Sequence, residues 1–156
     1  MSRDDELQAL VDRVAEAASA FIGGDIRTYV RLLPHATGYT LMSPYGGVRH
    51  GFDHSDEALD ATARHFQGGE AKLEVVQAER SGDLALLVAV ERQHGVVGAP
   101  PAQDWSLRVT LVFCREEGEW RLLHRHADAL VHEIDHAHLA RLAGGDSQPG
   151  HSDSSG

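Results

Sequence analysis

The sequence predicts an α+β protein with a mostly antiparallel sheet. Three stretches with helical spacing of apolar residues lie within residues 3–66, together with two short strand candidates. Four longer strand-like stretches then follow one another from Leu73 to Leu130. Helices gathered early and consecutive long strands late are typical of the α+β class, and strands joined by short turns pair antiparallel.

Composition and charge limit the functional classes. The 156 residues suffice for one domain with its own core, which we predict over 1–142, followed by a disordered polar tail over 143–156. A formal net charge of −10 argues against a nucleic-acid partner. No apolar run approaches the roughly 20 residues of a membrane span, and the acidic start lacks a signal-peptide pattern. The single cysteine, Cys114, fits a reducing compartment. We therefore predict a cytoplasmic protein without a membrane partner.

The helices are predicted from apolar spacing and from capping residues. Residues 3–22 form one apolar stripe and end at Gly23-Gly24. Asp25 can cap a short second helix that closes at Pro34, and Ser55 can cap a third that ends at Gly68-Gly69. Near the C-terminus, Val131–Leu142 has the pattern of a final helix.

The strands are predicted from alternation and from the turns between them. The candidates are Tyr39–Met42, Val48–Phe52, Leu73–Arg80, Leu84–Gln93 and the two arms of a hairpin over Trp105–Leu130. Between the last two regions, Gly95–Gln103 is a predicted loop, because Pro100-Pro101 precludes regular pairing.

The hairpin carries the most informative pattern of the chain. A two-residue turn at Glu117-Gly118 pairs Glu116 with Glu119 and then Phe113 with Leu122. Further along the hairpin, this register sets Leu111 opposite His124, Val109 opposite His126 and Leu107 opposite Asp128. Because Glu-Gly is a weaker turn pair than Asn-Gly, a longer loop with a bulge is the alternative. The register therefore predicts that His124, His126 and Asp128 lie on the apolar, core-facing side.

Two interpretations of this polar triplet remain open. In the catalytic one, His126 is a general acid or base, Asp128 orients it, and His124 or Tyr45 donates a hydrogen bond to a developing oxyanion. In the structural one, the histidines are hydrogen-bonded to neighbouring groups. Three polar groups on an apolar face are costly unless they are paired or used, which favours the first interpretation.

Further residues are predicted to line the same pocket. The ligand-binding candidates are Tyr39, Ser43, Tyr45, Trp105, Val109 and Leu111. The tyrosines could equally be core residues with solvated hydroxyls. Arg108 and Arg125 are predicted to lie on the opposite face of the hairpin, on a dimer surface.

His132-Glu133-Ile134-Asp135-His136 formally matches the HExxH zinc motif on the predicted final helix. Eleven histidines make a chance match common, and nothing after this terminal helix would bury a metal site. We predict no metal and no other cofactor, with His138 at most part of an adventitious surface cluster.

The order of elements resembles the SnoaL-like family of the nuclear transport factor 2-like superfamily. The matching features are Gly24-Asp25 after the opening helix, the segment Leu32–Thr37, and the closing pattern Gly118-x-Trp120-x-Leu122-x-His124-x-His126. The resemblance covers about residues 5–131. It implies a cone, with a strongly bent sheet wrapped around the N-terminal helices, a pocket inside, and frequently a homodimer across the outer sheet face.

The resemblance leaves the function open, because the superfamily holds isomerases, cyclases, dehydratases, hydrolases and non-catalytic association domains. Where ketosteroid isomerases carry an aspartate base before a proline, this chain has Ser43 before Pro44, which argues against that chemistry. The first hypothesis is a cofactor-free acid–base enzyme acting on a small hydrophobic molecule. The alternative is a non-catalytic ligand-binding or dimeric association module.

Overall fold

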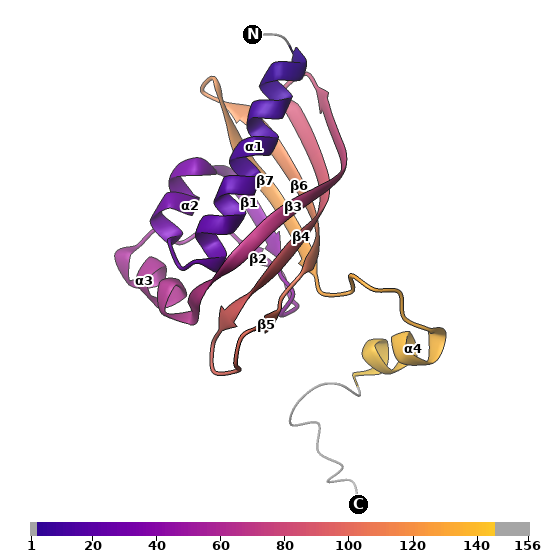
Figure 1. Ribbon diagram of the computed structural model, residues 1–156. Helices are drawn as coiled ribbons and strands as arrows, with labels where there is room; N and C mark the ends of the chain where they lie inside the picture. Colours follow the sequence, from indigo (N-terminus) through magenta and orange to yellow (C-terminus); the bar gives the residue numbers. More distant parts are fainter. Residues whose placement is uncertain (1–2, 146–156) are drawn as a thin grey trace, which may run out of the picture.

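A strongly curved sheet wraps around three helices in the computed structural model, which describes residues 3–145 (Figure 1). The helices are α1 (Arg3–Ile22), α2 (Ile26–Leu32), α3 (Asp56–His65) and α4 (His136–Gly144). The strands are β1 (His35–Met42), β2 (Arg49–His50), β3 (Phe66–Ser81), β4 (Leu84–Val97), β5 (Gln103–Asp104), β6 (Leu107–Glu116) and β7 (Glu119–Asp128). The predicted α+β class and the cone-shaped, strongly bent sheet are confirmed.

Helix α1 lies across the concave face of the sheet (Figure 1). Its apolar stripe is almost fully buried: Leu10, Val14 and Ala17 are 3%, 1% and 0% exposed. The helix ends as predicted at a glycine pair, and Gly24 has a φ of +84°. A Cβ atom at Gly24 would lie 2.4 Å from the carbonyl oxygen of Phe66, so only glycine fits this turn.

The caps predicted for the next two helices are confirmed. Asp25 accepts a hydrogen bond from the backbone N–H of Thr28 at 3.3 Å, and Ser55 accepts one from Ala58 at 3.2 Å. Each cap satisfies a backbone donor that the first helical turn leaves free. Helices α2 and α3 lie beside α1 on the same side of the sheet (Figure 1).

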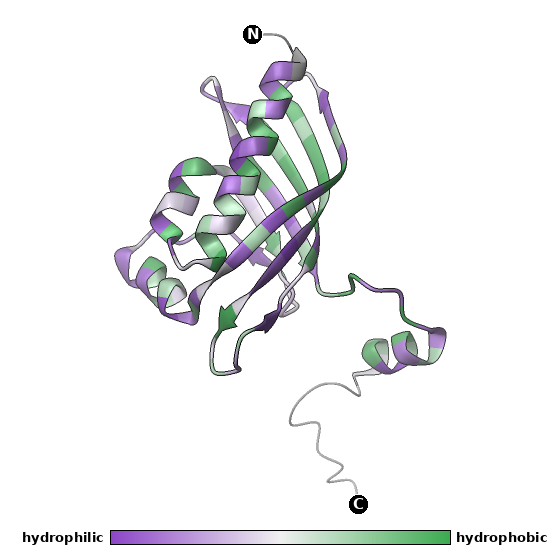
Figure 2. Ribbon diagram, in the orientation of Figure 1, coloured by the Kyte–Doolittle hydropathy of each residue, from purple (hydrophilic) through white to green (hydrophobic). Residues whose placement is uncertain are grey.

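The strand order is β2-β1-β7-β6-β4-β3, with β5 paired to β4. Every pairing is antiparallel except that of β1 with β7, which is parallel. Strand β4 continues to Val97, so the first part of the loop predicted over 95–103 is paired with β3. Figure 2 shows the apolar residues gathered on α1 and on the central strands behind it.

The hairpin register is confirmed near the turn and wrong beyond it. Glu117 and Gly118 both have positive φ, Glu116 pairs with Glu119, and Phe113 pairs with Leu122. A bulge follows, because the next pairs are Val112 with His124, Leu111 with Arg125, Thr110 with His126 and Arg108 with Asp128. One extra residue in β7 moves every later side chain to the opposite face.

The two faces of the sheet therefore differ from the predicted ones. The concave inner face holds Val109, Leu111, Phe113 and Leu122, each at most 2% exposed. Arg125 joins this face, although the sequence placed it on a dimer surface. His124, His126 and Asp128 lie on the convex outer face, level with half-buried Val112 and Thr110.

The segment after β7 departs from the prediction. Helix α4 begins at His136 rather than near Val131, is capped by Asp135, and ends at Gly144 before the left-handed Gly145. In Figure 1 it lies away from the sheet and the other helices. Residues 143–145 are thus part of this helix and its cap, and the rest of the predicted tail lies outside the described residues. No helix in the described part of the chain has the length and apolar character to cross a membrane.

Candidate functional site

Two members of the polar triplet of β7, His124 and Asp128, are hydrogen-bonded on the outer face. Nδ1 of His124 lies 2.7 Å from the hydroxyl of Thr40 on β1. The carboxylate of Asp128 accepts two hydrogen bonds from Arg108, at 3.0 and 3.1 Å, and one from the backbone N–H of Leu130. These bonds, Arg108 foremost, lower the pKa of Asp128. Asp128 is therefore bound to Arg108, and no hydrogen bond joins it to His126 in the described residues.

An ion pair occupies the inner face instead. Arg125 donates two hydrogen bonds to the carboxylate of Glu91 on β4, at 2.9 and 3.0 Å. The side chains of Glu91 and Arg125 are 5% and 19% exposed. Burial alone would lower the pKa of Arg125, but the charge and hydrogen bonds of Glu91 outweigh burial and raise it. Glu91 and Arg125 carry opposite formal charges, so together they add no net charge to the interior.

Two tyrosines accompany this ion pair. Tyr29 on α2 and Tyr39 on β1 are 7% and 3% exposed. Burial raises the pKa of both phenols, and the nearby charge of Arg125 only partly offsets it. Both hydroxyls therefore stay protonated near neutral pH and are available as hydrogen-bond donors.

His35, the first residue of β1, lies in a box of aromatic rings. Its ring stacks on Phe52 with the centroids 4.0 Å apart, and Tyr39 approaches edge-on at 4.4 Å. Tyr29 lies 5.8 Å away. Both ring nitrogens of His35 are buried and have no hydrogen-bond partner among the described residues. Burial chiefly, and the nearby His54 and Arg125, lower its pKa to about 3, so the ring is neutral at physiological pH.

We call Tyr29, His35, Tyr39, Glu91 and Arg125 the inner polar cluster. It combines two hydroxyl donors, one neutral imidazole with a free donor and a free acceptor, and a closed ion pair. A base with a pKa near 3 is a weak proton acceptor at neutral pH. The inner polar cluster is therefore better suited to hydrogen bonding than to proton transfer.

A hollow of about 550 Å³ lies outside this cluster. It is lined by Arg49, His50, Gly51, Phe52 and Asp53, and it is open to solvent. Phe52 takes part in both regions, since it lines the hollow and stacks on His35. A second open hollow, of about 380 Å³, lies between β3, β4 and β5 around Lys72, Arg92 and Asp104.

The predicted ligand-binding residues fall in three places. Tyr39, Val109 and Leu111 are on the inner face, and all three pack in the apolar core. Ser43 accepts a hydrogen bond from the backbone of Tyr45, which is 76% exposed and whose hydroxyl lies 3.0 Å from Nε2 of His65.

Trp105 lies between β5 and β6. It is half-buried, and its buried indole N–H has no partner among the described residues.

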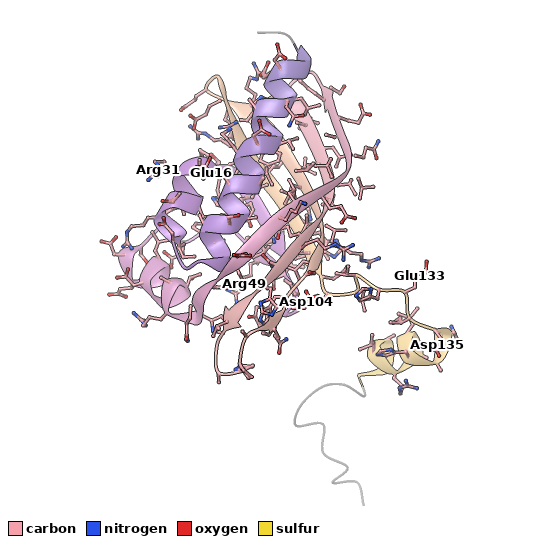
Figure 3. All side chains as sticks on the ribbon, in the orientation of Figure 1. Glu16, Arg31, Arg49, Asp104, Glu133 and Asp135 are labelled. Carbon is pink, nitrogen blue, oxygen red and sulfur yellow. The ribbon has the colours of Figure 1, made fainter. Side chains whose placement is uncertain are left out.

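The HExxH residues do not form a helical motif. His132 and Glu133 precede the N-cap of α4, so His132 and His136 are not one turn apart on a helix. Figure 3 shows Glu133 and Asp135 on the segment that leads away from the body of the protein. Within residues 3–145, no group of three or more histidine, cysteine or acidic side chains is placed to hold a metal ion.

The ion pair of Glu91 with Arg125 was not predicted, although the sequence contained a signal for Glu91. Ala85, Leu87, Ala89 and Glu91 alternate along β4, so Glu91 had to share the face of three apolar residues. A carboxylate at such a position requires a partner. Leu122-Leu123 was the corresponding hint in β7, because two consecutive leucines break the alternation where the bulge occurs. No pattern of this kind pointed to His35 or Phe52.

A strongly curved sheet around an N-terminal helix, with polar groups on its concave face, defines a cone-shaped α+β fold. The chain belongs to the family of SnoaL-like domains, whose model matches residues 9–131. No curated protein sequence matches the chain.

Solved structures share the fold, and several of them, including one from Streptomyces avermitilis, are of the nuclear transport factor 2-like type. The Streptomyces avermitilis protein is provisionally assigned as a dehydratase, at 19% identity and a TM-score of 0.66, covering 84% of this chain and 100% of that one. Another is the CaMKII hub of S. rosetta, at 18% identity and 0.62, covering 78% and 95%. The association domain of C. elegans CaMKII gives 18% identity and 0.58, covering 81% and 97%. These likenesses establish the fold and leave the activity open.

Proposed function

We propose that this chain binds a small molecule at the inner polar cluster. The observation that carries the proposal is His35, whose two ring nitrogens are buried without a partner. A buried donor or acceptor left unpaired costs about 1–3 kcal/mol, so such groups usually have a partner such as a water or a ligand. The tyrosine hydroxyls and the ion pair place further polar groups on the same apolar inner face.

The test is a ligand screen on the full chain with ¹³C-labelled histidine, followed by NMR. The variant His35→Phe assigns the ring signal of His35 by its absence. A binding molecule is expected to shift the His35 signal and to lose affinity in His35→Phe, while the matched variant His126→Phe, altered on the exposed outer face, keeps it. Molecules that bind without moving the His35 signal would contradict the proposed site.

Catalysis by His126, Asp128 and His124 stays a separate prediction. A substrate of that reaction would have to bind on the outer face, where Asp128 is occupied by Arg108. Replacing His126 with alanine and measuring turnover of an identified substrate tests it directly. Unchanged turnover would exclude His126 as the acid or base.

A second candidate function is association of two copies through the outer face. Leu86 on β4 pairs with Val112 on β6, and the next outward residues are Val88 and Val90. These side chains are half-buried and apolar, which is typical of a surface that a partner covers. The CaMKII association domain and hub are named for assembly, which supports an assembly role for this fold.

Sedimentation of the wild type and of Val88→Glu tests this association. We expect a dimer that the glutamate dissociates, because it would place a charge in an apolar contact. Val76→Glu is the matched control, since Val76 is 66% exposed on β3, at the bulge outside the row of Val88. A monomeric wild type would exclude the dimer.

A further inference from the structure

Helix α4 lies beyond the domain that the family shares. The family match ends at residue 131, whereas α4 begins at His136. Its side chains are exposed except that of Leu142, which is half-buried, and Leu139 is 49% exposed. With nine residues, α4 is shorter than the roughly 12–15 residues that an isolated helix needs to be stable in water. The helix therefore needs a surface on which to pack.

One side of α4 is apolar, and its only formal charge is positive. Leu139, Leu142 and Ala143 are spaced three and four residues apart, so they form one stripe along the helix. Arg141 lies outside this stripe, and the segment His136–Gly144 contains no acidic residue. The whole chain, in contrast, carries a formal net charge of −10. In charge, α4 is thus complementary to another copy of the same chain.

The outer face of the sheet offers a matching surface. Leu86, Val88 and Val90 form an apolar row along β4, and Val112 lies beside Leu86 on β6. On the other side of this row, Glu79 on β3 pairs with Leu86. Glu79 is exposed, and among residues 3–145 no ion pair or side-chain hydrogen bond engages it. An apolar row bordered by an unpaired carboxylate suits a helix with a leucine stripe and a neighbouring arginine.

The two surfaces also agree in length. A helix rises 1.5 Å per residue, so α4 is about 14 Å long. The row from Leu86 to Val90 covers four residue steps of about 3.4 Å, which is again about 14 Å. The helix can therefore lie along β4 with its stripe in contact over the whole row.

The chain leaves β7 at the border of this outer face. The backbone N–H of Leu130 donates to the carboxylate of Asp128, and that of Val131 donates to the carbonyl of Ala129, both at 2.9 Å. From there the chain runs away from its own sheet (Figure 1). Residues 129–135 connect β7 to α4 and span at most about 25 Å. An arm of this reach starts beside the face through which two copies are proposed to associate.

We propose that α4 is an exchanged arm, which packs on the outer face of a second copy of this chain. The stripe of Leu139 and Leu142 covers residues 86–90 of the second copy. Arg141 lies beside Glu79 of the partner subunit. This inference rests on the proposed association through the outer face, because it names the element that each copy contributes to it.

Sedimentation of the full chain over a concentration series tests the arm. Leu139→Glu is expected to raise the dissociation constant of the dimer about tenfold or more, because each dimer loses two leucine contacts and buries two charges. Ala137→Glu is the matched control, since it adds the same charge two residues earlier, on the opposite side of the helix. Equal dissociation constants for the wild type and Leu139→Glu, or equal effects of the two glutamates, would overturn the arm.

Charge reversal tests where the arm lies. Arg141→Glu and Glu79→Arg are each expected to raise the dissociation constant about threefold or more, because each places like charges side by side. The double variant should recover most of the affinity, since opposite charges face each other again. Additive losses in the double variant would overturn the position of Arg141 beside Glu79.

The outcomes separate the arm from the proposed association. If Val88→Glu dissociates the dimer and Leu139→Glu does not, association through the outer face stands and the arm is overturned. A monomeric wild type overturns both. A monomer whose urea midpoint falls in Leu139→Glu, but not in Ala137→Glu, would show that α4 packs on its own copy, which also overturns the exchange.

Discussion

His35 should make the protein unstable in mild acid. Its pKa is lowered to about 3 in the folded protein, chiefly by burial, whereas an unfolded histidine titrates near pH 6.5. Between these values the unfolded state binds the proton that the folded state excludes. Above about pH 6.5, the titration of His35 therefore does not change the free energy of unfolding. That free energy falls as the pH drops from about 6.5 toward 3.

The size of the effect follows from the two pKa values. One proton taken up only by the unfolded state changes the free energy of unfolding by about 1.4 kcal/mol per pH unit. At pH 5 this amounts to a loss of about 2 kcal/mol from His35 alone. Carboxylates whose pKa is lowered on folding, such as Asp128, add to the loss in the same direction. The contribution of His35 must therefore be isolated by comparison with a variant.

The assay is urea unfolding of wild type and His35→Phe at pH 7.5 and pH 5.0. At pH 7.5 we expect the variant to be at least as stable as the wild type, because it removes two unpaired buried nitrogens and keeps an aromatic ring in the box. At pH 5.0 the variant should gain about 2 kcal/mol relative to the wild type. His126→Phe controls for the loss of a histidine ring, and we expect a much smaller change. A wild-type-to-variant difference that stays constant between the two pH values would refute the reasoning.

Three further predictions concern stability. Arg125→Met should lower the free energy of unfolding by about 3–5 kcal/mol in urea titrations, because it leaves the buried carboxylate of Glu91 without its partner. The double variant Glu91→Gln, Arg125→Met should recover much of that loss, and additive losses would contradict the pairing. Glu6→Gln should lower the melting temperature at pH 7 and have less effect near pH 3. Burial alone would raise the pKa of Glu6, but the hydrogen bond from Trp120 and the charges of Arg115 and Arg80 outweigh burial and lower it. The stabilisation by Glu6 is therefore lost as the pH falls below the pKa of this carboxyl in the unfolded chain. Gly24→Ala should cost more than about 1 kcal/mol by thermal unfolding, since a Cβ would meet the backbone of Phe66; a neutral result would contradict the left-handed turn.

The elements predicted from sequence match the structure where the signal is local. Apolar spacing identified α1, and the capping residues Asp25 and Ser55 placed the starts of α2 and α3. The turn at Glu117-Gly118 was correctly predicted for the same reason. A cap or a two-residue turn depends on atoms within four residues, so its cause is contained in the sequence that forms it.

The final helix was wrong at its start although its cap is local. The apolar spacing from Val131 onward suggested one continuous helix, whereas Asp135 caps a shorter one. The apolar pattern is compatible with several starting residues. Asp135, which is the N-cap in the structure, is also tolerated inside a helix, where it destabilises the helix by only a few tenths of a kcal/mol relative to the best helix-forming residues.

The candidate site depended on interactions that the sequence does not contain locally. The sequence by itself determined that β4 would carry a carboxylate on its apolar face, because the alternation of Ala85, Leu87 and Ala89 continues to Glu91. Only the tertiary structure decided its partner. The bulge in β7 moved Arg125 inward and His124, His126 and Asp128 outward. Arg125 then meets Glu91, 34 residues earlier in the chain, because the curved sheet brings β4 and β7 to the same face. The parallel pairing of β1 with β7 likewise placed His35 beside Leu122, where burial keeps its ring neutral and unpaired.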